Sequence, residues 1–325
     1  MLAPKGEVWR VYDLKVFTGR AHPDLAREVC SYLSIPLGQA EIKTFSNENI
    51  FVRINESVRE ADVFVIQPSC SPVNDGLMEL LIMIDALKRA SAARICAVMP
   101  YYPYARSDKK DQPRVPITAR LVADLLTVAG ATRVVTIDLH ASQIQGFFNI
   151  PVDHLTALPI IASYFKKRAI PSLVLVAPDA GRAKLAARYA EVLRAPMAII
   201  DKRRIGNEDL AKATYMVGDV EGKNALLVDD EITTGGSLVE AVGILKDHGA
   251  KDIYFACTHA VLTAEATGRI RESGVKEVVV TNSVPVDERK RADNITVLSV
   301  GRLLAGAIRC IHSGGSIGRL FEQEW

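Results

Sequence analysis

Short runs of apolar residues alternate along the chain with longer segments in which apolar residues recur every three or four positions. Arg94–Met99, Leu173–Val176 and Ile253–Thr258 are apolar nearly throughout, which is typical of strands buried on both faces of a parallel sheet. Leu77–Arg89 and Arg182–Leu193 have the spacing of helices. Because strands and helices alternate, the pattern predicts an α/β fold with mostly parallel, doubly wound sheets.

The same pattern predicts the remaining elements. We expect further strands at Val11–Thr18, Ile50–Ile54, Asp62–Gln67, Val134–Ile137, Ala198–Ile200, Ala225–Val228, Glu277–Thr281 and Thr296–Val300. We expect further helices at Asp24–Leu33, Pro116–Val128, Ala264–Glu272 and Arg302–Ile311, and one that follows Ser237. The connection over residues 151–159 is rich in turn residues and separates two similar series of elements. We therefore expect two related domains, residues 1–155 and 156–325.

Composition restricts the class of protein. The formal net charge of +2 gives no reason to expect a nucleic acid or a membrane as partner, so an anion site must be local. Hydrophobic residues at 49% and charged residues at 24% are usual for a soluble globular chain. Five cysteines are dispersed without metal-like spacing, which fits a reducing compartment. Charged residues interrupt the N-terminal segment, so we expect no signal peptide and a cytoplasmic protein.

The stretch from residue 225 to residue 237 combines a buried strand with candidate chemistry. After the apolar run Ala225–Val228 come the adjacent carboxylates Asp229 and Asp230, and then a turn of hydroxyl and glycine residues that leads into a helix. Ligands of parallel sheets bind at such strand ends, and a helix start offers unpaired N–H groups to an anion. The turn therefore suits a phosphate, and the carboxylates suit sugar hydroxyls or a hydrated cation. The alternative is an acidic strand end with a glycine-rich turn and no ligand.

Three other segments carry candidate chemistry. Asp138-Leu139-His140 ends a strand; a lone histidine is more often structural, but this position favours a metal or phosphate role. Tyr101–Arg114 is charged, aromatic and interrupted by prolines, and is either a solvated surface loop or a flap that closes over polyphosphate. Lys202-Arg203-Arg204 is a basic segment that follows a strand, and its alternative is a solvated turn.

These motifs resemble those of ribose-phosphate pyrophosphokinases over nearly the whole chain. The stretch 225–237 resembles the phosphoribosyl-diphosphate loop of type I phosphoribosyltransferases, and the run 138–148 matches the pyrophosphokinase signature. Further matching segments are 45–48, 74–84, 103–106, 177–181 and 201–204. The resemblance implies two similar doubly wound domains of the type I phosphoribosyltransferase kind. It also implies Mg²⁺-dependent transfer of the diphosphoryl group of ATP to the C1 hydroxyl of ribose 5-phosphate, which gives 5-phosphoribosyl 1-diphosphate and AMP.

The resemblance also implies roles for individual residues. Lys202 and Arg204 would be catalytic, and His140 and Asp179 would hold Mg²⁺. ATP would be bound by Phe45, Asn47, Glu48, Asn49, Arg106 and Ser107. Ribose 5-phosphate would be bound by Arg204, Asp229, Thr233, Thr234, Gly235, Gly236 and Ser237. Members of the family assemble as dimers within hexamers, so a homo-oligomer is expected.

Four positions depart from the family pattern. Asn49, Ser107, Arg182 and Thr233 stand where the family commonly has Glu, Gln, Gly and Asp, with Glu48 shifted by one position. Thr233 offers a hydroxyl in place of a carboxylate, so we expect weaker binding of ribose 5-phosphate, by about 1 kcal/mol for one such contact.

Two alternative functions stay open. A phosphoribosyltransferase would consume the activated sugar instead of making it, but the 138–148 signature and the length of 325 residues count against this function. A regulatory subunit with a weakened site is the second alternative. The presence of His140, Asp179, Lys202 and Arg204 counts against it.

Overall fold

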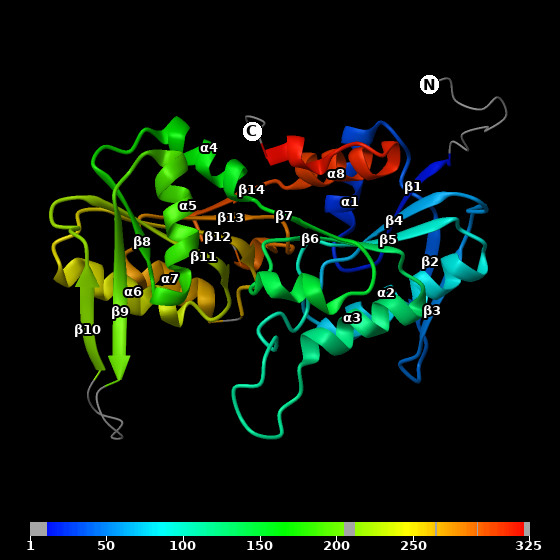
Figure 1. Cartoon of the computed structure of the whole chain (residues 1–325), viewed down its shortest axis with the longest axis horizontal. Coiled ribbons are helices and arrows are strands. Elements are labelled where there is room, and N and C mark those ends of the chain that lie inside the picture. The colour runs from blue at the N-terminus through cyan, green and yellow to red at the C-terminus, as the bar shows by residue number, and fades with distance from the viewer. Residues whose placement is uncertain (1–11, 205–211, 264, 291, 322–325) are drawn as a thin grey trace, which may run out of the picture.

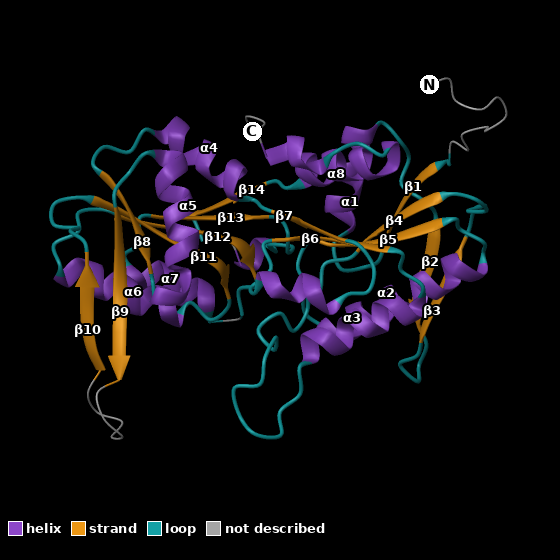
Figure 2. Cartoon of the chain, viewed as in Figure 1, coloured by secondary structure: helices purple, strands orange, loops and turns teal. Residues whose placement is uncertain are grey.

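The computed structural model describes residues 12–204, 212–263, 265–290 and 292–321, and it describes the backbone alone at 202–204, 212–214, 289 and 321. In this part of the chain two main sheets lie end to end, with helices on both faces (Figures 1 and 2). No helix in the described part has the length and apolar character needed to cross a membrane.

The N-terminal sheet has five parallel strands in the order β1-β4-β5-β6-β7. These strands are β1 (Leu14–Thr18), β4 (Asp62–Ile66), β5 (Arg94–Met99), β6 (Arg133–Ile137) and β7 (Val152–Leu155). The antiparallel hairpin of β2 (Ala40–Thr44) and β3 (Ile50–Ile54) forms a separate small sheet. The helices of this half are α1 (Pro23–Leu33), α2 (Val73–Arg89) and α3 (Thr118–Ala129), with a short 3-10 turn η1 (Ser142–Phe147).

The C-terminal sheet has seven strands in the order β10-β9-β8-β11-β12-β13-β14. They are β8 (Leu173–Ala177), β9 (Met197–Arg204), β10 (Lys212–Val217), β11 (Asn224–Ile232), β12 (Ile253–Ala260), β13 (Glu277–Thr281) and β14 (Ile295–Leu298). Only the β9–β10 pair is antiparallel in this sheet. The helices that follow residue 155 are α4 (Leu158–Arg168), α5 (Ala183–Leu193), α6 (Gly236–Asp247), α7 (Ala266–Ser273) and α8 (Gly301–Ser313). The short turns are η2 (Ala180–Arg182), η3 (Glu288–Lys290) and η4 (Ile317–Phe321).

The two halves share one connectivity. The series β1-α1-β2-β3-β4-α2-β5-α3-β6-β7-α4 corresponds, element by element, to β8-α5-β9-β10-β11-α6-β12-α7-β13-β14-α8. In both series the first, fourth, fifth, sixth and seventh strands lie side by side in that order. The hairpin β2–β3 therefore corresponds to β9–β10, and the turn after β4 corresponds to the turn after β11.

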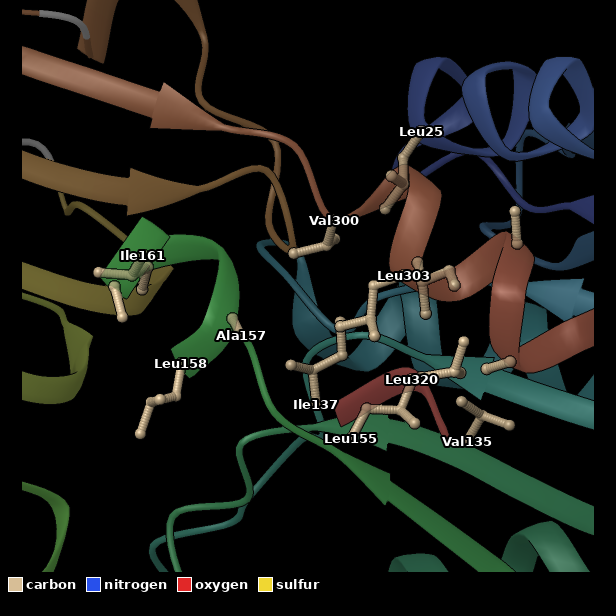
Figure 3. Packing of buried hydrophobic residues seen from close by; sticks show 14 of the residues in the cluster. Leu25, Val135, Ile137, Leu155, Ala157, Leu158, Ile161, Val300, Leu303 and Leu320 are labelled. Carbon is tan, nitrogen blue, oxygen red and sulfur yellow. The ribbon is translucent and has the colours of Figure 1, made fainter. Parts of the chain in front are cut away.

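The last helix of each series packs on the other half of the molecule. α4 follows β7 but packs against α5, whereas α8 follows β14 but packs against α1 (Figure 1). One hydrophobic core runs through these four helices, and Figure 3 shows Leu25 of α1 near Val300 and Leu303 at the start of α8. Fully burying one such leucine stabilises the fold by about 1.5–3 kcal/mol. The domain boundary at residues 155 and 156 stays a prediction, because helices from both sides of it share this core.

The α/β fold with mostly parallel sheets agrees with the sequence prediction, and β2 and β3 are the two strand-like runs expected on either side of the polar turn 45–49. Three elements were not predicted: the pattern gave no strand at β7 or β10, and it gave no helix at α4. The connection 151–159, read as turns, contains β7, whose polar residues are held in a strand by parallel pairing with β6. The basic segment Lys202–Arg204 was expected in a loop, but its backbone completes β9 by pairing with β10. Main-chain pairing thus overrides weak local propensity in these segments.

Candidate active site

The turn between β11 and α6 surrounds a small cavity. β11 ends at Ile232, and Gly235 adopts a left-handed conformation with φ +75°, which glycine reaches without strain. The cavity has a volume of about 150 Å³. Its lining includes six residues predicted to bind ribose 5-phosphate, namely Asp229, Thr233, Thr234, Gly235, Gly236 and Ser237. Hydroxyls and the helix start therefore line one cavity, which is an arrangement that suits a phosphate.

The two adjacent carboxylates at the end of β11 share a cation. The Arg182 guanidinium lies with Nε 2.7 Å from Asp229 Oδ1 and with Nη2 2.7 Å from Asp230 Oδ1. Burial raises the pKa of Asp229, and the hydrogen bond and charge of Asp230 raise it further, while Arg182 acts in the opposite direction. Burial would also raise the pKa of Asp230, but the hydrogen bond from His140 and the charge of Arg182 outweigh it and hold this pKa below its usual range. On balance the pKa of Asp229 is raised and that of Asp230 is lowered, so Asp230 is the more acidic member of the pair, while Arg182 favours the ionised form of both.

His140 reaches the same acid pair from the other sheet. Its Nδ1 lies 2.7 Å from Asp230 Oδ2 and 2.9 Å from Arg182 Nη2. Asp230 can only accept from Nδ1 and Arg182 can only donate to it, so the two partners favour opposite tautomers; the shorter contact, with Asp230, corresponds to a proton on Nδ1 and a lone pair on Nε2. A carboxylate that orients an imidazole in this way is the usual support of a metal-binding histidine.

Asp179 lies at the end of β8 and caps the next turn. Its Oδ1 accepts a hydrogen bond of 3.1 Å from the backbone N–H of Arg182. The side chain is otherwise exposed beside the cavity wall that Pro178 contributes. Asp179 therefore keeps a carboxylate oxygen directed to solvent while its position is fixed by the turn.

His140 and Asp179 can be compared with what Mg²⁺ requires of a protein site. The described residues contain no cluster of three or more His, Cys, Asp or Glu side chains that could enclose a metal ion. Mg²⁺ keeps several waters and is usually bound through one or two carboxylates and the phosphates of its substrate. His140 with its oriented Nε2 and Asp179 with its exposed oxygen fit such a sparse, water-rich site.

Glu231 connects the predicted flap to the phosphate turn. This buried carboxylate accepts a hydrogen bond of 2.8 Å from the Tyr101 hydroxyl and lies 2.5 Å from Arg106 Nε. Burial, together with the charge of Glu231, raises the pKa of Tyr101 above its usual range, which keeps that hydroxyl protonated as a donor. Arg106, predicted to bind ATP, also lines the cavity. The first part of the Tyr101–Arg114 segment is therefore anchored and is not a simple solvated loop.

The other predicted ATP residues lie apart from this cluster. Ser107 Oγ accepts a hydrogen bond of 3.3 Å from the backbone N–H of Thr118, at the start of α3. The residues Phe45, Asn47, Glu48 and Asn49 form the turn between β2 and β3, at the end of the N-terminal sheet farthest from the C-terminal sheet (Figure 1). Phe45 is 48% exposed there. The single chain does not bring this hairpin to the acid pair.

Lys202 and Arg204, predicted to be catalytic, lie at the end of β9, where their backbones pair with β10. β9 is the neighbour of β8, whose end carries Asp179. The side chains of both residues lie outside the described part of the chain.

Polar contacts join the ends of the two sheets behind the cavity. Asp138 Oδ2 accepts hydrogen bonds from the Ala157 N–H at 2.8 Å and from Thr258 Oγ1 at 2.6 Å. His259 is buried, with Nε2 3.1 Å from the carbonyl oxygen of Ile137. Asp138 therefore has a structural role in joining the two halves.

Three residues at this site were not predicted from the sequence, namely Glu231, Tyr101 and Arg269. Glu231 lines the cavity as the predicted residue Asp229 does, and the two-residue period of a strand could have placed both side chains on one face. Nothing in the sequence distinguished Tyr101 from the other aromatic residues of its segment. Arg269 of α7 lies with Nη1 3.5 Å from the Thr234 carbonyl oxygen, so it adds positive charge near the phosphate turn. Only packing of α7 against α6 brings this arginine there.

Comparison with known proteins identifies relatives along most of the chain. Residues 14–130 match the family model described as the N-terminal domain of ribose phosphate pyrophosphokinase, and residues 210–322 match a phosphoribosyl synthetase-associated domain. A ribose-phosphate pyrophosphokinase of Caldanaerobacter subterraneus is 56% identical over 309 residues, which cover 95% of this chain and 98% of the relative. One from Bacillus subtilis is 47% identical over 310 residues, again 95% of this chain and 98% of the relative. The crystal structure of phosphoribosylpyrophosphate synthetase from Mycobacterium smegmatis aligns with a TM-score of 0.89 and 48% identity, over 93% of this chain and 100% of that one.

Proposed function

Because the chain belongs to the ribose-phosphate pyrophosphokinase family, we propose that the residues gathered where its two sheets meet perform the family's reaction. The enzyme transfers the β,γ-diphosphoryl group of ATP to the C1 hydroxyl of ribose 5-phosphate. A bond forms between the C1 oxygen and the β-phosphorus while the bond from that phosphorus to the oxygen of AMP breaks. The proposal concerns which residues bind, orient and stabilise the reacting groups.

Ribose 5-phosphate binds in the cavity of the β11–α6 turn. The hydroxyls of Thr234 and Ser237 and the N–H groups at the start of α6 donate to the 5-phosphate. The Asp229 carboxylate accepts hydrogen bonds from the ribose hydroxyls, with Thr233 beside it. The cavity lined by Asp229 and by the glycine-rich helix start is the observation that carries this assignment.

ATP arrives with a divalent cation. His140 and Asp179 would hold Mg²⁺ together with the ATP phosphates, and the bound ion would neutralise charge on the transferring group. Arg106 and Ser107 contact the nucleotide from the start of the flap. Phe45 stacks on the adenine, and Asn47, Glu48 and Asn49 contact the rest of the nucleotide.

Lys202 and Arg204 stabilise the charge that develops during transfer. Phosphoryl transfer needs little covalent chemistry from the protein, so positioning and electrostatic stabilisation supply most of the rate. Both residues end a strand next to β8, whose end carries Asp179. Arg204 also contacts the ribose 5-phosphate.

The reaction is tested by incubating the protein with ATP, Mg²⁺ and ribose 5-phosphate and following products by ³¹P NMR. We expect equal amounts of AMP and 5-phosphoribosyl 1-diphosphate. A phosphoribosyltransferase would instead consume that product when a nucleobase is added, and a regulatory subunit would give neither signal. His140→Ala and Asp179→Ala should each raise the Mg²⁺ concentration that gives the half-maximal rate. If this concentration is unchanged in both variants, these residues do not bind the metal.

We propose a homo-oligomer in which a second subunit completes the ATP site. Two observations support this: the Phe45 hairpin lies away from the acid pair of its own chain, and α3 exposes an apolar row. Leu121, Leu125 and Val128 of that helix are 54%, 39% and 77% exposed at helical spacing.

Mixed assemblies of Lys202→Ala and Phe45→Ala subunits should then be more active than either variant alone, since some sites combine the intact Lys202 of one subunit with the intact Phe45 of the other. No gain on mixing would place the whole ATP site in one chain. A cytoplasmic location is part of the same proposal.

A further inference from the structure

Arg182 fills the space that faces both carboxylates at the end of β11. Its guanidinium contacts Asp229 and Asp230 at 2.7 Å each, and its side chain is only 18% exposed. The backbone N–H of the same residue is fixed by Asp179. Arg182 is therefore held at both ends, by a strand-end carboxylate at its backbone and by the acid pair at its tip.

The contacts of the acid pair account for three of its four oxygens. Asp229 Oδ1 pairs with Arg182 Nε and accepts a hydrogen bond of 2.8 Å from the Asp230 N–H. Asp230 Oδ1 pairs with Arg182 Nη2 and accepts a hydrogen bond of 3.0 Å from the Glu231 N–H. Asp230 Oδ2 pairs with His140. Within the described part of the chain, no arginine, histidine or main-chain donor contacts Asp229 Oδ2; the two carboxyl groups also interact with each other, and Asp229 lines the ribose cavity.

Two adjacent, largely buried carboxylates are a strong attractor for a divalent cation. An ion bound there would use the same oxygens that Arg182 occupies and would lie against a positive guanidinium. Arginine keeps its charge at all accessible pH values, and its planar guanidinium can pair with two carboxylate oxygens at once. Arg182 therefore competes with a divalent cation for these oxygens at every pH.

We propose that Arg182 is a specificity-determining residue: it acts as a resident cation that closes the Asp229–Asp230 pair to divalent metal. Asp229 Oδ2 is thereby reserved for a hydroxyl of the sugar, a role that rests on the proposed function. The divalent ion that accompanies ATP is then confined to the side of His140 and Asp179. Arg182 is a positioning residue in this scheme, because it acts through the carboxylates and not on the reacting atoms.

The test measures binding of Mn²⁺ alone, in the absence of ATP and sugar, by the electron paramagnetic resonance signal of the free ion. Arg182→Gly should bind Mn²⁺ at least tenfold more tightly than the wild type, or bind one more ion per chain. Lys184→Ala is the matched control, since it removes an equal charge from an exposed position two residues away and should bind as the wild type does. Adding Asp229→Asn to Arg182→Gly should abolish the gain.

A second readout follows from linkage, since a ligand that binds only the folded state raises the melting temperature. Without metal, Arg182→Gly leaves two carboxylates uncompensated and should melt below the wild type. Millimolar Mg²⁺ should restore its melting temperature while moving that of Lys184→Ala no more than that of the wild type. If Arg182→Gly fails to fold, Arg182→Gln removes the charge at nearly constant shape and should show the same gain.

Equal Mn²⁺ binding by the wild type and by whichever of these two variants folds would overturn the proposal. A gain that persists after Asp229→Asn would overturn it as well, because the new ion would then lie elsewhere. The binding assay contains no substrate, so its result is independent of the diphosphoryl transfer assay. Failure of transfer with a positive Mn²⁺ result removes the proposed function alone.

Discussion

The turn after β4 and the turn after β11 occupy equivalent places in two halves of like connectivity, yet only the second lines the cavity described above. In the N-terminal half, polar side chains beside the turn bond to one another. Gln67 is 1% exposed and donates to Glu79 Oε1 at 3.0 Å, and Glu79 in turn accepts from the N–H and the Nε of Arg20, each at 2.6 Å. In the C-terminal half, hydroxyls and Gly235 and Gly236 leave the space open.

The difference shows that equal connectivity places a turn at the same strand end in both halves, and that the side chains of each turn determine whether a cavity lies there. Both turns lie at the carboxyl end of a central parallel strand, where ligands of such sheets bind. Gln67 and Glu79 bond to each other and Glu79 bonds to Arg20, so these contacts beside the first turn contribute stability, although the buried Ser69 hydroxyl has no hydrogen-bond partner in the described part of the chain. We propose that the second turn leaves its groups for a ligand.

The largest contrast is expected between the two corresponding hairpins, β9–β10 and β2–β3. Lys202→Ala, in the first, should lower kcat by about a hundredfold or more and leave KM for ATP nearly unchanged, the pattern of a contact made in the transition state. Phe45→Ala, in the second, should mainly raise KM for ATP. Steady-state kinetics on both variants measure the split, and an unchanged kcat in Lys202→Ala with a much higher KM would assign that lysine to substrate binding.

The two turns can be compared directly at their glycines. Gly235→Val forces a β-branched residue to φ +75°, which costs about 1–3 kcal/mol locally and displaces the phosphate-binding N–H groups. We expect kcat/KM for ribose 5-phosphate to fall about thirtyfold to a hundredfold. Gly76→Ala, in the first turn of α2 directly after the equivalent connection, is the control, since an added Cβ there meets nothing closer than 3.8 Å. It should leave both KM values unaltered, and a comparable loss in this variant would contradict a purely structural role for the β4–α2 turn.

Glu79→Ala tests that structural role through stability. The change leaves the buried Gln67 amide and the Arg20 N–H without their acceptor, and unsatisfied buried groups of this kind cost about 1–3 kcal/mol. The free energy of unfolding, measured in urea, should fall by about 2 kcal/mol, while KM for ribose 5-phosphate stays the same in the folded enzyme. A raised sugar KM at unchanged stability would mean that the first turn also binds substrate.

The smallest effect concerns Thr233, at the edge of the cavity. A carboxylate here should be a better acceptor for the sugar, but Thr233 Oγ1 lies 3.5 Å from Glu231 Oε1, so Asp would face a buried like charge. We expect Thr233→Asp alone to raise KM for ribose 5-phosphate severalfold, and Thr233→Asp with Glu231→Gln to reverse that change. If the single variant already lowers the sugar KM, Glu231 exerts no repulsion on this position.

The sequence predicted most of the fold because buried parallel strands leave a strong local signal. β5, β8 and β13 are apolar and end near their predicted residues, and the turn between β11 and α6 was predicted from its glycine and hydroxyl residues between an apolar run and a helical pattern. α4 was missed because its apolar residues are followed by Lys166, Lys167 and Arg168, and because its partner α5 is distant in sequence. β10 is an edge strand held only by its pairing with β9, which no local pattern encodes.

The charges of the site were less predictable than its turn. Arg182 was identified as a departure that adds bulk and charge, but its fork across Asp229 and Asp230 depends on how β8 and β11 pair. The contact of Arg106 with Glu231 joins residues from opposite sheets. Such contacts are set by tertiary packing, so a single sequence gives the residue types but not the partners.

The exchange of α4 and α8 between the halves has a consequence for how substrates reach the site. Two domains joined by a single linker can rotate apart about that linker. Here α4 packs against α5 and α8 packs against α1, so the last helix of each half is part of a core shared with the other half. A hinge rotation between the halves would separate buried apolar side chains such as Leu303 from the residues they pack against. The loss of these contacts opposes a large rotation of one half away from the other. Entry and release must therefore proceed through small displacements of the turns and hairpins around a rigid frame.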